Sequence, residues 1–205
     1  MRGDGLDCRT VNGDTRDDPQ RADKLSSVTP ICGCEKHRTS RYSPGIISSN
    51  ETLTRFVFSP IHVSKKGGVL PALFNQVHSS GCSVQRDSIA SNSEITTFVS
   101  TFLSAKEDRV WMGVVSAVCE NVREIRIEGT GERVLCVFDT AEKANPAHGE
   151  MCRARVIDEA DRAELRNHLY KAFNSKFVIA PDGYRAGKVW ANLSNGLRSR
   201  PKLST

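Results

Sequence analysis

The segment from Arg55 to Arg86, in which short apolar runs alternate with cationic and small polar residues, constrains the fold of this chain most strongly. It opens on bulky apolar residues typical of a buried strand over 52–59, and Pro60 ends that strand. Apolar residues then recur three and four positions apart, which predicts a short helix over 69–77. A second short strand is predicted over 82–85. Strand, helix and strand in so short a stretch predict an α+β domain.

Strand and helix signals continue to alternate along the chain. Helices are predicted over 92–105, behind a Ser-x-x-Glu capping box, and over 158–174, behind a capping aspartate. The remaining strand signals cover 110–118, 124–128, 133–138, 151–156 and 176–180. The second and third of these predict a hairpin, and the fourth predicts an edge strand. We therefore expect a mostly antiparallel sheet of five or six short strands with two or three helices packed on one face.

The two ends of the chain differ in composition from its middle. Residues 1–48 alternate acidic and basic side chains without a hydrophobic period, which predicts a disordered, charged segment. Residues 183–205 contain basic but no acidic side chains, which predicts a flexible basic tail. Residues 49–182 then form one globular α+β domain, as expected for a chain of 205 residues.

The formal net charge is +5 and the pI is about 8.9. Such an excess serves solubility, or it favours nucleic acid and phosphorylated ligands if the cations gather on one face. No apolar run of about 18 residues occurs, so no membrane-spanning helix is expected. The first residues lack the apolar stretch of a secretory signal, and a cytoplasmic location is therefore expected.

The chain contains seven cysteines. Those that lie among apolar residues predict buried, reduced thiols of a reducing compartment: Cys82, Cys119, Cys136 and Cys152. Cys32, Cys34 and His37, with Cys8 upstream, offer too few well-spaced ligands to identify a zinc site, which usually has four. Free thiols and a metal site both remain open for that segment. The sequence predicts no bound metal and no cofactor.

Cationic and polar side chains in the 55–86 segment form the candidate site. Arg55 lies on a predicted core strand, where its guanidinium needs a partner because an unpaired buried charge is costly. A ligand phosphate or carboxylate would serve, and so would an internal salt bridge. The candidate internal partners are Asp87, Asp139 and Glu150. Ser83, beside Arg86, can donate a hydrogen bond to a bound anion, but its neighbours do not form a nucleophile elbow.

Two histidines extend this candidate site. His62 precedes Lys65 and Lys66, whose charges should lower its pKa and leave the imidazole neutral at about pH 7. A neutral imidazole can act as a general base, whereas a loop histidine bonded to the backbone is the simpler interpretation. His148 lies in a turn and faces either a cleft or solvent. Together they resemble the histidine pair of RNA-cleaving phosphoesterases, whose H-x-T/S pattern is present at 62–64 and absent at 148–150.

Further basic residues lie outside the predicted strands and could also contact an anion. Lys65 and Lys66 precede two glycines, but the loop lacks the residue order of a Walker loop. In the C-terminal tail, Arg185 and Lys188 are interleaved with aromatic residues, which can stack on and neutralise a single nucleic-acid strand. The same composition is typical of a frayed terminus.

The middle of the chain, residues 50–175, resembles a group of small uncharacterised bacterial proteins. The matching pieces are Arg55-Phe56-Val57-Phe58, His62, Ser83-Val84-Gln85-Arg86 and Ala144-Asn145-Pro146-Ala147-His148-Gly149. The resemblance implies no activity and no functional residues.

From these patterns we expect a small cytoplasmic binding module that recognises a phosphate-bearing partner, with nucleic acid the first candidate. Its ligand-binding residues would be Arg55, Lys65, Lys66, Ser83, Arg86, Arg185 and Lys188. The alternative is a small enzyme acting on a nucleotide or phosphodiester, with His62 and His148 transferring protons. A protein-interaction or assembly component is the third possibility.

Overall fold

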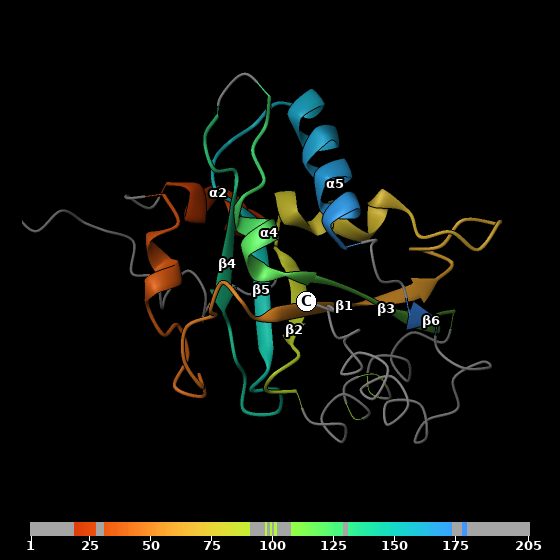
Figure 1. Ribbon diagram of the computed structural model, residues 1–205, viewed down its shortest axis with the longest axis horizontal. Helices are drawn as coiled ribbons and strands as arrows, with labels where there is room; N and C mark the ends of the chain where they lie inside the picture. The colour runs from red at the N-terminus through yellow and green to blue at the C-terminus, as the bar shows by residue number, and fades with distance from the viewer. Residues whose placement is uncertain are drawn as a thin grey trace, which may run out of the picture.

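One antiparallel sheet forms the frame of the molecule (Figure 1). The computed structural model describes residues 19–27, 31–90, 97, 99, 101, 108–128, 131–173 and 178–179. Its strands pair in the order β4-β5-β2-β1-β3-β6. Their bounds are Thr52–Ser59 for β1, Cys82–Arg86 for β2, Val110–Val118 for β3, Leu135–Asp139 for β4, His148–Arg153 for β5 and Val178–Ile179 for β6. The predicted α+β fold is confirmed.

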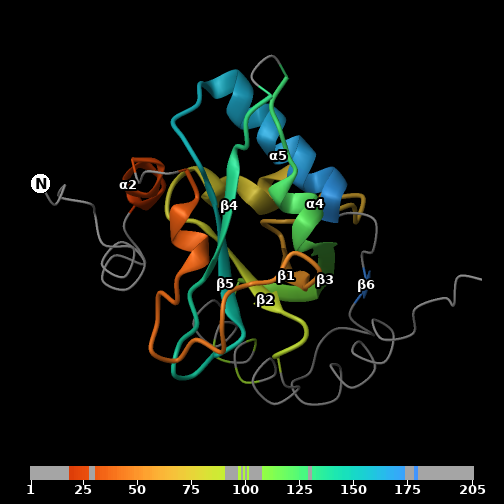
Figure 2. The same ribbon diagram turned by 60° about the vertical axis from the view of Figure 1, so that its left-hand side comes forward.

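Helices cover one face of this sheet (Figure 1, Figure 2). They are the 3₁₀ helix η2 (Pro71–His78), the short helix α4 (Cys119–Arg123) and the long helix α5 (Glu159–Phe173). At the start of α5, the backbone N–H of Asp161 donates to the carboxylate of Asp158, which caps the helix as predicted. Apolar residues of all three helices and of the sheet form one buried core.

The pairing of β1 with its two neighbours is unequal. It pairs with β3 along its whole length, from Thr52↔Val118 to Ser59↔Val110. With β2 it pairs only at Leu53↔Arg86 and Thr54↔Gln85. The β1–β2 ladder ends at Thr54, and the space between the two strands beyond it, under helix η2, is here called the wedge. This wedge positions the candidate site.

Several elements differ from their predictions. The helix predicted over 69–77 is a 3₁₀ helix rather than an α-helix. Residues 124–128 do not form the predicted strand. They follow directly after α4, and only Arg126 among them pairs with another strand-like residue, in an isolated bridge to Arg133. β5 is not an edge strand, since it pairs with β4 on one side and β2 on the other, and its residues are all buried. The helix predicted over 92–105 lies almost entirely outside the described residues.

The sequence predicts disorder for residues 1–48, but the structure orders the described part of that segment. Residues 31–47, here called the strap, run along the sheet edge formed by β4. A disulfide joins Cys32 to Cys136 of β4, and Cys34 is disulfide-bonded as well. The Thr39 hydroxyl donates to the carbonyl of Asp139, and Ile47 enters the core. A disulfide or a side-chain hydrogen bond does not require regularly spaced apolar residues. The hydrophobic pattern of the sequence therefore could not predict the order of the strap.

The short helix α2 (Arg21–Ser26) is attached by charges. Arg21 is fully buried and pairs with Glu150 of β5, while Asp23 pairs with Arg153. The buried thiols are confirmed for Cys82, Cys119 and Cys152, which are free, and are wrong for Cys136. No helix in the described part of the chain is long and apolar enough to cross a membrane. The predicted tail over 183–205 lies outside the described residues.

Candidate functional site

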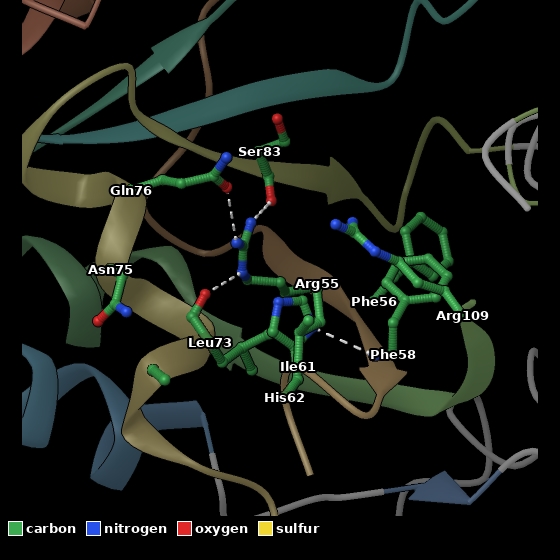
Figure 3. A pocket seen from close by; sticks show the side chains of 11 residues that line it. Arg55, Phe56, Phe58, Ile61, His62, Leu73, Asn75, Gln76, Ser83 and Arg109 are labelled. Atoms are coloured by element: carbon green, nitrogen blue, oxygen red, sulfur yellow. Dashed lines mark hydrogen bonds between the residues drawn. The ribbon is translucent and has the colours of Figure 1, made fainter. Parts of the chain in front are cut away.

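A pocket of about 400 Å³ occupies the wedge between β1 and β2 (Figure 3). Helix η2 forms one wall of the pocket, and the turn after β1 forms a second. Arg109, the residue before β3, lines a third side. It is lined by Arg55, Phe56, Phe58, Ile61, His62, Ala72, Leu73, Asn75, Gln76, Ser83 and Arg109. Its volume falls within the range of roughly 300–1,000 Å³ that is usual for small-molecule sites.

Arg55 is the central residue of this pocket. It lies on β1 between the core residues Leu53 and Val57, and only 6% of its surface is exposed. Its guanidinium donates to the carbonyl of Leu73 at 2.9 Å, the carbonyl of Ser83 at 2.6 Å and the side-chain oxygen of Gln76 at 3.4 Å. All three acceptors are uncharged, so the hydrogen bonds orient the guanidinium without neutralising it (Figure 3).

The divergence of the strands explains this arrangement. Ser83 would face β1 in a continued ladder, but the ladder stops at Thr54↔Gln85. The Arg55 guanidinium replaces the missing backbone donor for the Ser83 carbonyl, which would otherwise be a buried acceptor without a partner. The internal salt bridge that the sequence left open does not form, because no carboxylate among the described residues pairs with Arg55. Asp139 and Glu150 pair instead with Arg86 and Arg21.

His62 stands beside Arg55 in the pocket wall (Figure 3). The backbone N–H of Phe58 donates to its Nδ1 at 3.1 Å, so in the neutral ring the proton is on Nε2. Burial, with the charges of Arg55 and Arg109, lowers the pKa of His62 to about 3. At neutral pH the imidazole is therefore an uncharged N–H donor and too weak a base to accept a proton efficiently.

Arg109 brings a second guanidinium to the pocket. No local sequence pattern indicated its role, because its position depends on the long-range register that places Val110, the first residue of β3, opposite Ser59. The amide side chains of Asn75 and Gln76 add polar groups, and no carboxylate occurs among the lining residues that the structure describes. This part of the lining is consequently rich in hydrogen-bond donors and carries two guanidinium groups.

Apolar side chains form the other part of the lining. Phe56 and Phe58 are largely buried, with ring centroids 6.4 Å apart, and Phe58 packs against the ring of His62. Ile61 is 38% exposed at the turn after β1. Cations beside an apolar wall suit an anion attached to an apolar body.

Arg86, predicted as an anion binder, lies elsewhere and is internally satisfied. It donates to both carboxylate oxygens of Glu51, at 2.8 and 2.7 Å, and to the strap carbonyls of Gly45 and Ile46. Its guanidinium is also 3.5 Å from a carboxylate oxygen of Asp139. Burial raises the pKa of Asp139, although Ser43 and Arg86 act against it. Arg86 therefore anchors the strap and does not line the pocket.

The remaining predicted residues are also separate from the pocket. His148 is fully buried on β5, where its Nδ1 lies 2.8 Å from the hydroxyl of Thr140, so the structure does not bring it together with His62. Lys65 and Lys66 are exposed in a tight loop whose Gly67 and Gly68 N–H groups bond within the loop to Ser64. Neither lysine is among the residues that line the pocket.

The proposed Cys32, Cys34 and His37 ligand set does not assemble either, since both cysteines are in disulfides and His37 is exposed. Arg185 and Lys188 lie outside the described residues. No family model, curated protein or solved structure matches this chain. The geometry and charge of the pocket are therefore the basis for a functional proposal.

The depressed pKa of His62 makes stability depend on pH. An unfolded histidine binds a proton below about pH 6.5, whereas folded His62 does so only near pH 3. Its contribution is therefore fully present above pH 6.5 and is lost as pH falls toward 3. The variant His62→Asn removes the titrating ring, and its amide oxygen can still accept the Phe58 N–H. Between these two pH limits, the unfolding free energy of the wild type should fall more steeply than that of the variant, by up to about 1.4 kcal/mol per pH unit.

Urea unfolding at several pH values between 4 and 7 measures this difference. Equal slopes for the wild type and His62→Asn would show that burial does not hold His62 neutral.

Proposed function

We propose that this domain is a binding module for a phosphate-bearing ligand, with the phosphate held in the Arg55 pocket. The observation that carries the proposal is the Arg55 guanidinium, which is buried, fixed by uncharged acceptors only, and open to a pocket whose described lining residues include no carboxylate. A buried charge of this kind is costly unless an opposite charge approaches it. An anion entering the pocket would supply that charge.

The number of donors favours phosphate. Three of the five N–H groups of Arg55 are used internally, which leaves two for a ligand. His62 and Arg109 belong to the same lining and add a ring N–H and a second guanidinium, whereas the Ser83 hydroxyl points away from Arg55 (Figure 3). Charge-assisted hydrogen bonds from several directions suit the oxygens of a phosphate group.

For the rest of the ligand we propose a nucleotide unit, free or as part of nucleic acid. The apolar side of the lining, formed by Phe56, Phe58 and Ile61, suits a flat or apolar group attached to the phosphate. Lys65 and Lys66, exposed in the loop that follows His62 in the chain, would then contact further phosphates of a longer chain.

A cytoplasmic location for this activity remains a prediction. The free thiols of Cys82, Cys119 and Cys152 are compatible with a reducing compartment, whereas the Cys32–Cys136 disulfide favours an oxidising one. The ratio of disulfide to dithiol in protein isolated from its cells under thiol-trapping conditions distinguishes the two.

Replacing Arg55 by methionine should weaken phosphate binding by roughly 10–100-fold, because charge-assisted hydrogen bonds contribute about 1.5–3 kcal/mol. Calorimetric titration with inorganic phosphate, phenyl phosphate, a nucleoside monophosphate and a short single-stranded oligonucleotide measures the effect. The unphosphorylated nucleoside should bind much more weakly than its monophosphate.

Lys143→Met is the matched control, since it removes one positive charge from the exposed loop between β4 and β5. It should leave phosphate binding unchanged. The proposal fails if Arg55→Met binds the monophosphate as tightly as Lys143→Met does. Oligonucleotide affinity that falls steeply with salt supports nucleic acid as the ligand, whereas tighter binding of the mononucleotide supports a free nucleotide.

A further inference from the structure

We propose that, once the Cys32–Cys136 disulfide is reduced, the chain binds a thiophilic divalent cation such as Zn²⁺ through Cys32, Glu35 and Cys136. The ligand atoms of these residues, two Sγ atoms and a carboxylate oxygen, all lie within 4.8 Å of one another. Both cysteines are buried, and Glu35 is nearly so. The site is at the junction of the strap with β4, away from the pocket, and is independent of the function proposed above.

The positions of the three ligands are fixed by different parts of the fold. Cys32 and Glu35 come from the segment around the 3₁₀ helix η1 (Gly33–Lys36), and Cys136 comes from β4. Arg133 pairs with one carboxylate oxygen of Glu35, and Arg123 of α4 lies 3.3 Å from the other. These contacts hold the carboxylate beside the sulfur atoms and still leave lone pairs for a cation.

The charges around the cluster also suit a dication. Arg123 and Arg133 already oppose the negative charge of Glu35. Two thiolates formed from Cys32 and Cys136 would balance the two positive charges of Zn²⁺, so metal binding would leave the net charge of the buried cluster unchanged. Cys152, a free thiol, lies in the same buried group and provides a further sulfur atom. Two sulfurs and one carboxylate satisfy the ligand preferences of zinc, with a fourth position for water or another thiol.

The conversion needs a reductant, and a phosphine can supply the electrons. The phosphine gives two electrons to the S–S bond and becomes a phosphine oxide with oxygen from water. Each sulfur takes up one proton as the bond breaks. The cation then binds the two sulfurs and displaces those two protons to solvent, so affinity should rise with pH.

Titration of the full-length, phosphine-reduced chain with Co²⁺ under argon tests the proposal. We expect one Co²⁺ per chain, with the near-ultraviolet charge-transfer absorption that cobalt–thiolate bonds produce, and displacement of the Co²⁺ by Zn²⁺. Cys136→Ser should weaken binding by more than the roughly 10–100-fold that is typical of changes outside the ligand set. Cys119→Ser, which alters a buried free thiol outside the cluster, should bind like the wild type.

Circular dichroism on each reduced sample separates loss of the site from loss of the fold. A folded, reduced wild-type chain without cobalt–thiolate absorption overturns the proposal. It is also overturned if Cys119→Ser loses as much affinity as Cys136→Ser, or if reduction unfolds the chain and added Zn²⁺ does not refold it.

Discussion

Replacing both Cys32 and Cys136 by alanine should lower the free energy of unfolding by about 4–5 kcal/mol, because a cross-link that closes a loop of roughly 100 residues restricts the unfolded chain by about that much. The two cysteines are 104 positions apart, so their disulfide closes most of the described domain into one loop. The strap should also detach from β4 and expose the backbone of this edge strand.

Denaturation in guanidinium chloride, with a chelator present to exclude metal binding, measures the effect. Cys119→Ala is the control, because it removes a buried thiol that forms no disulfide. It should cost about 1 kcal/mol, the central value for point substitutions. A double variant that is no less stable than this control would mean that the strap contributes nothing to the fold.

Arg86→Met should destabilise the protein by about 3–5 kcal/mol, the usual cost of removing one partner from a buried ion pair. The substitution leaves the carboxylates of Glu51 and Asp139 without their cation, and it also removes two hydrogen bonds to the strap. Burial by itself raises the pKa of Glu51, but the bonds from Arg86 and Ser48 outweigh it and hold that pKa below its ordinary value. Both carboxylates therefore depend on Arg86.

Comparison with Arg55→Met makes this prediction specific. Arg55 has no carboxylate partner among the described residues, so its loss leaves only uncharged acceptors without a donor and should cost about 1–3 kcal/mol. Adding Asp139→Asn to Arg86→Met should restore part of the stability, since it removes one of the unpaired charges. If Arg55→Met proves the more damaging of the two single variants, the structural and ligand-binding roles assigned to these arginines are reversed.

Local patterns in the sequence were sufficient for much of the fold. β1 and β3 appear close to their predicted bounds because each has a strong apolar pattern, and α5 does so because its capping aspartate and its stripe of Leu165, Leu169 and Phe173 are local features. Arg55, His62 and Ser83 come together because β1, η2 and β2 follow one another through short connections. For these residues, proximity in the chain was a good guide to proximity in space.

Features that depend on long-range pairing could not be predicted in the same way. Arg109 reaches the pocket only because β3 pairs with β1 in one particular register. Arg86, only a few residues from Ser83, turns away from the pocket because Glu51 and the strap carbonyls attract its guanidinium. The order of the strap arises from a disulfide and polar contacts, neither of which produces a hydrophobic period.

We propose that Arg55 binds the anion in the pocket, whereas Arg86 is a structural cation. Nitrogen-15 NMR of the arginine Nε–H groups during titration with a nucleoside monophosphate tests it within one sample, because the two signals report on the two roles at once. We expect the Arg55 signal to shift and saturate together with that of the His62 ring, while the Arg86 signal stays in place. An Arg55 signal that does not move when the ligand is in large excess, or an Arg86 signal that moves equally, would contradict the account.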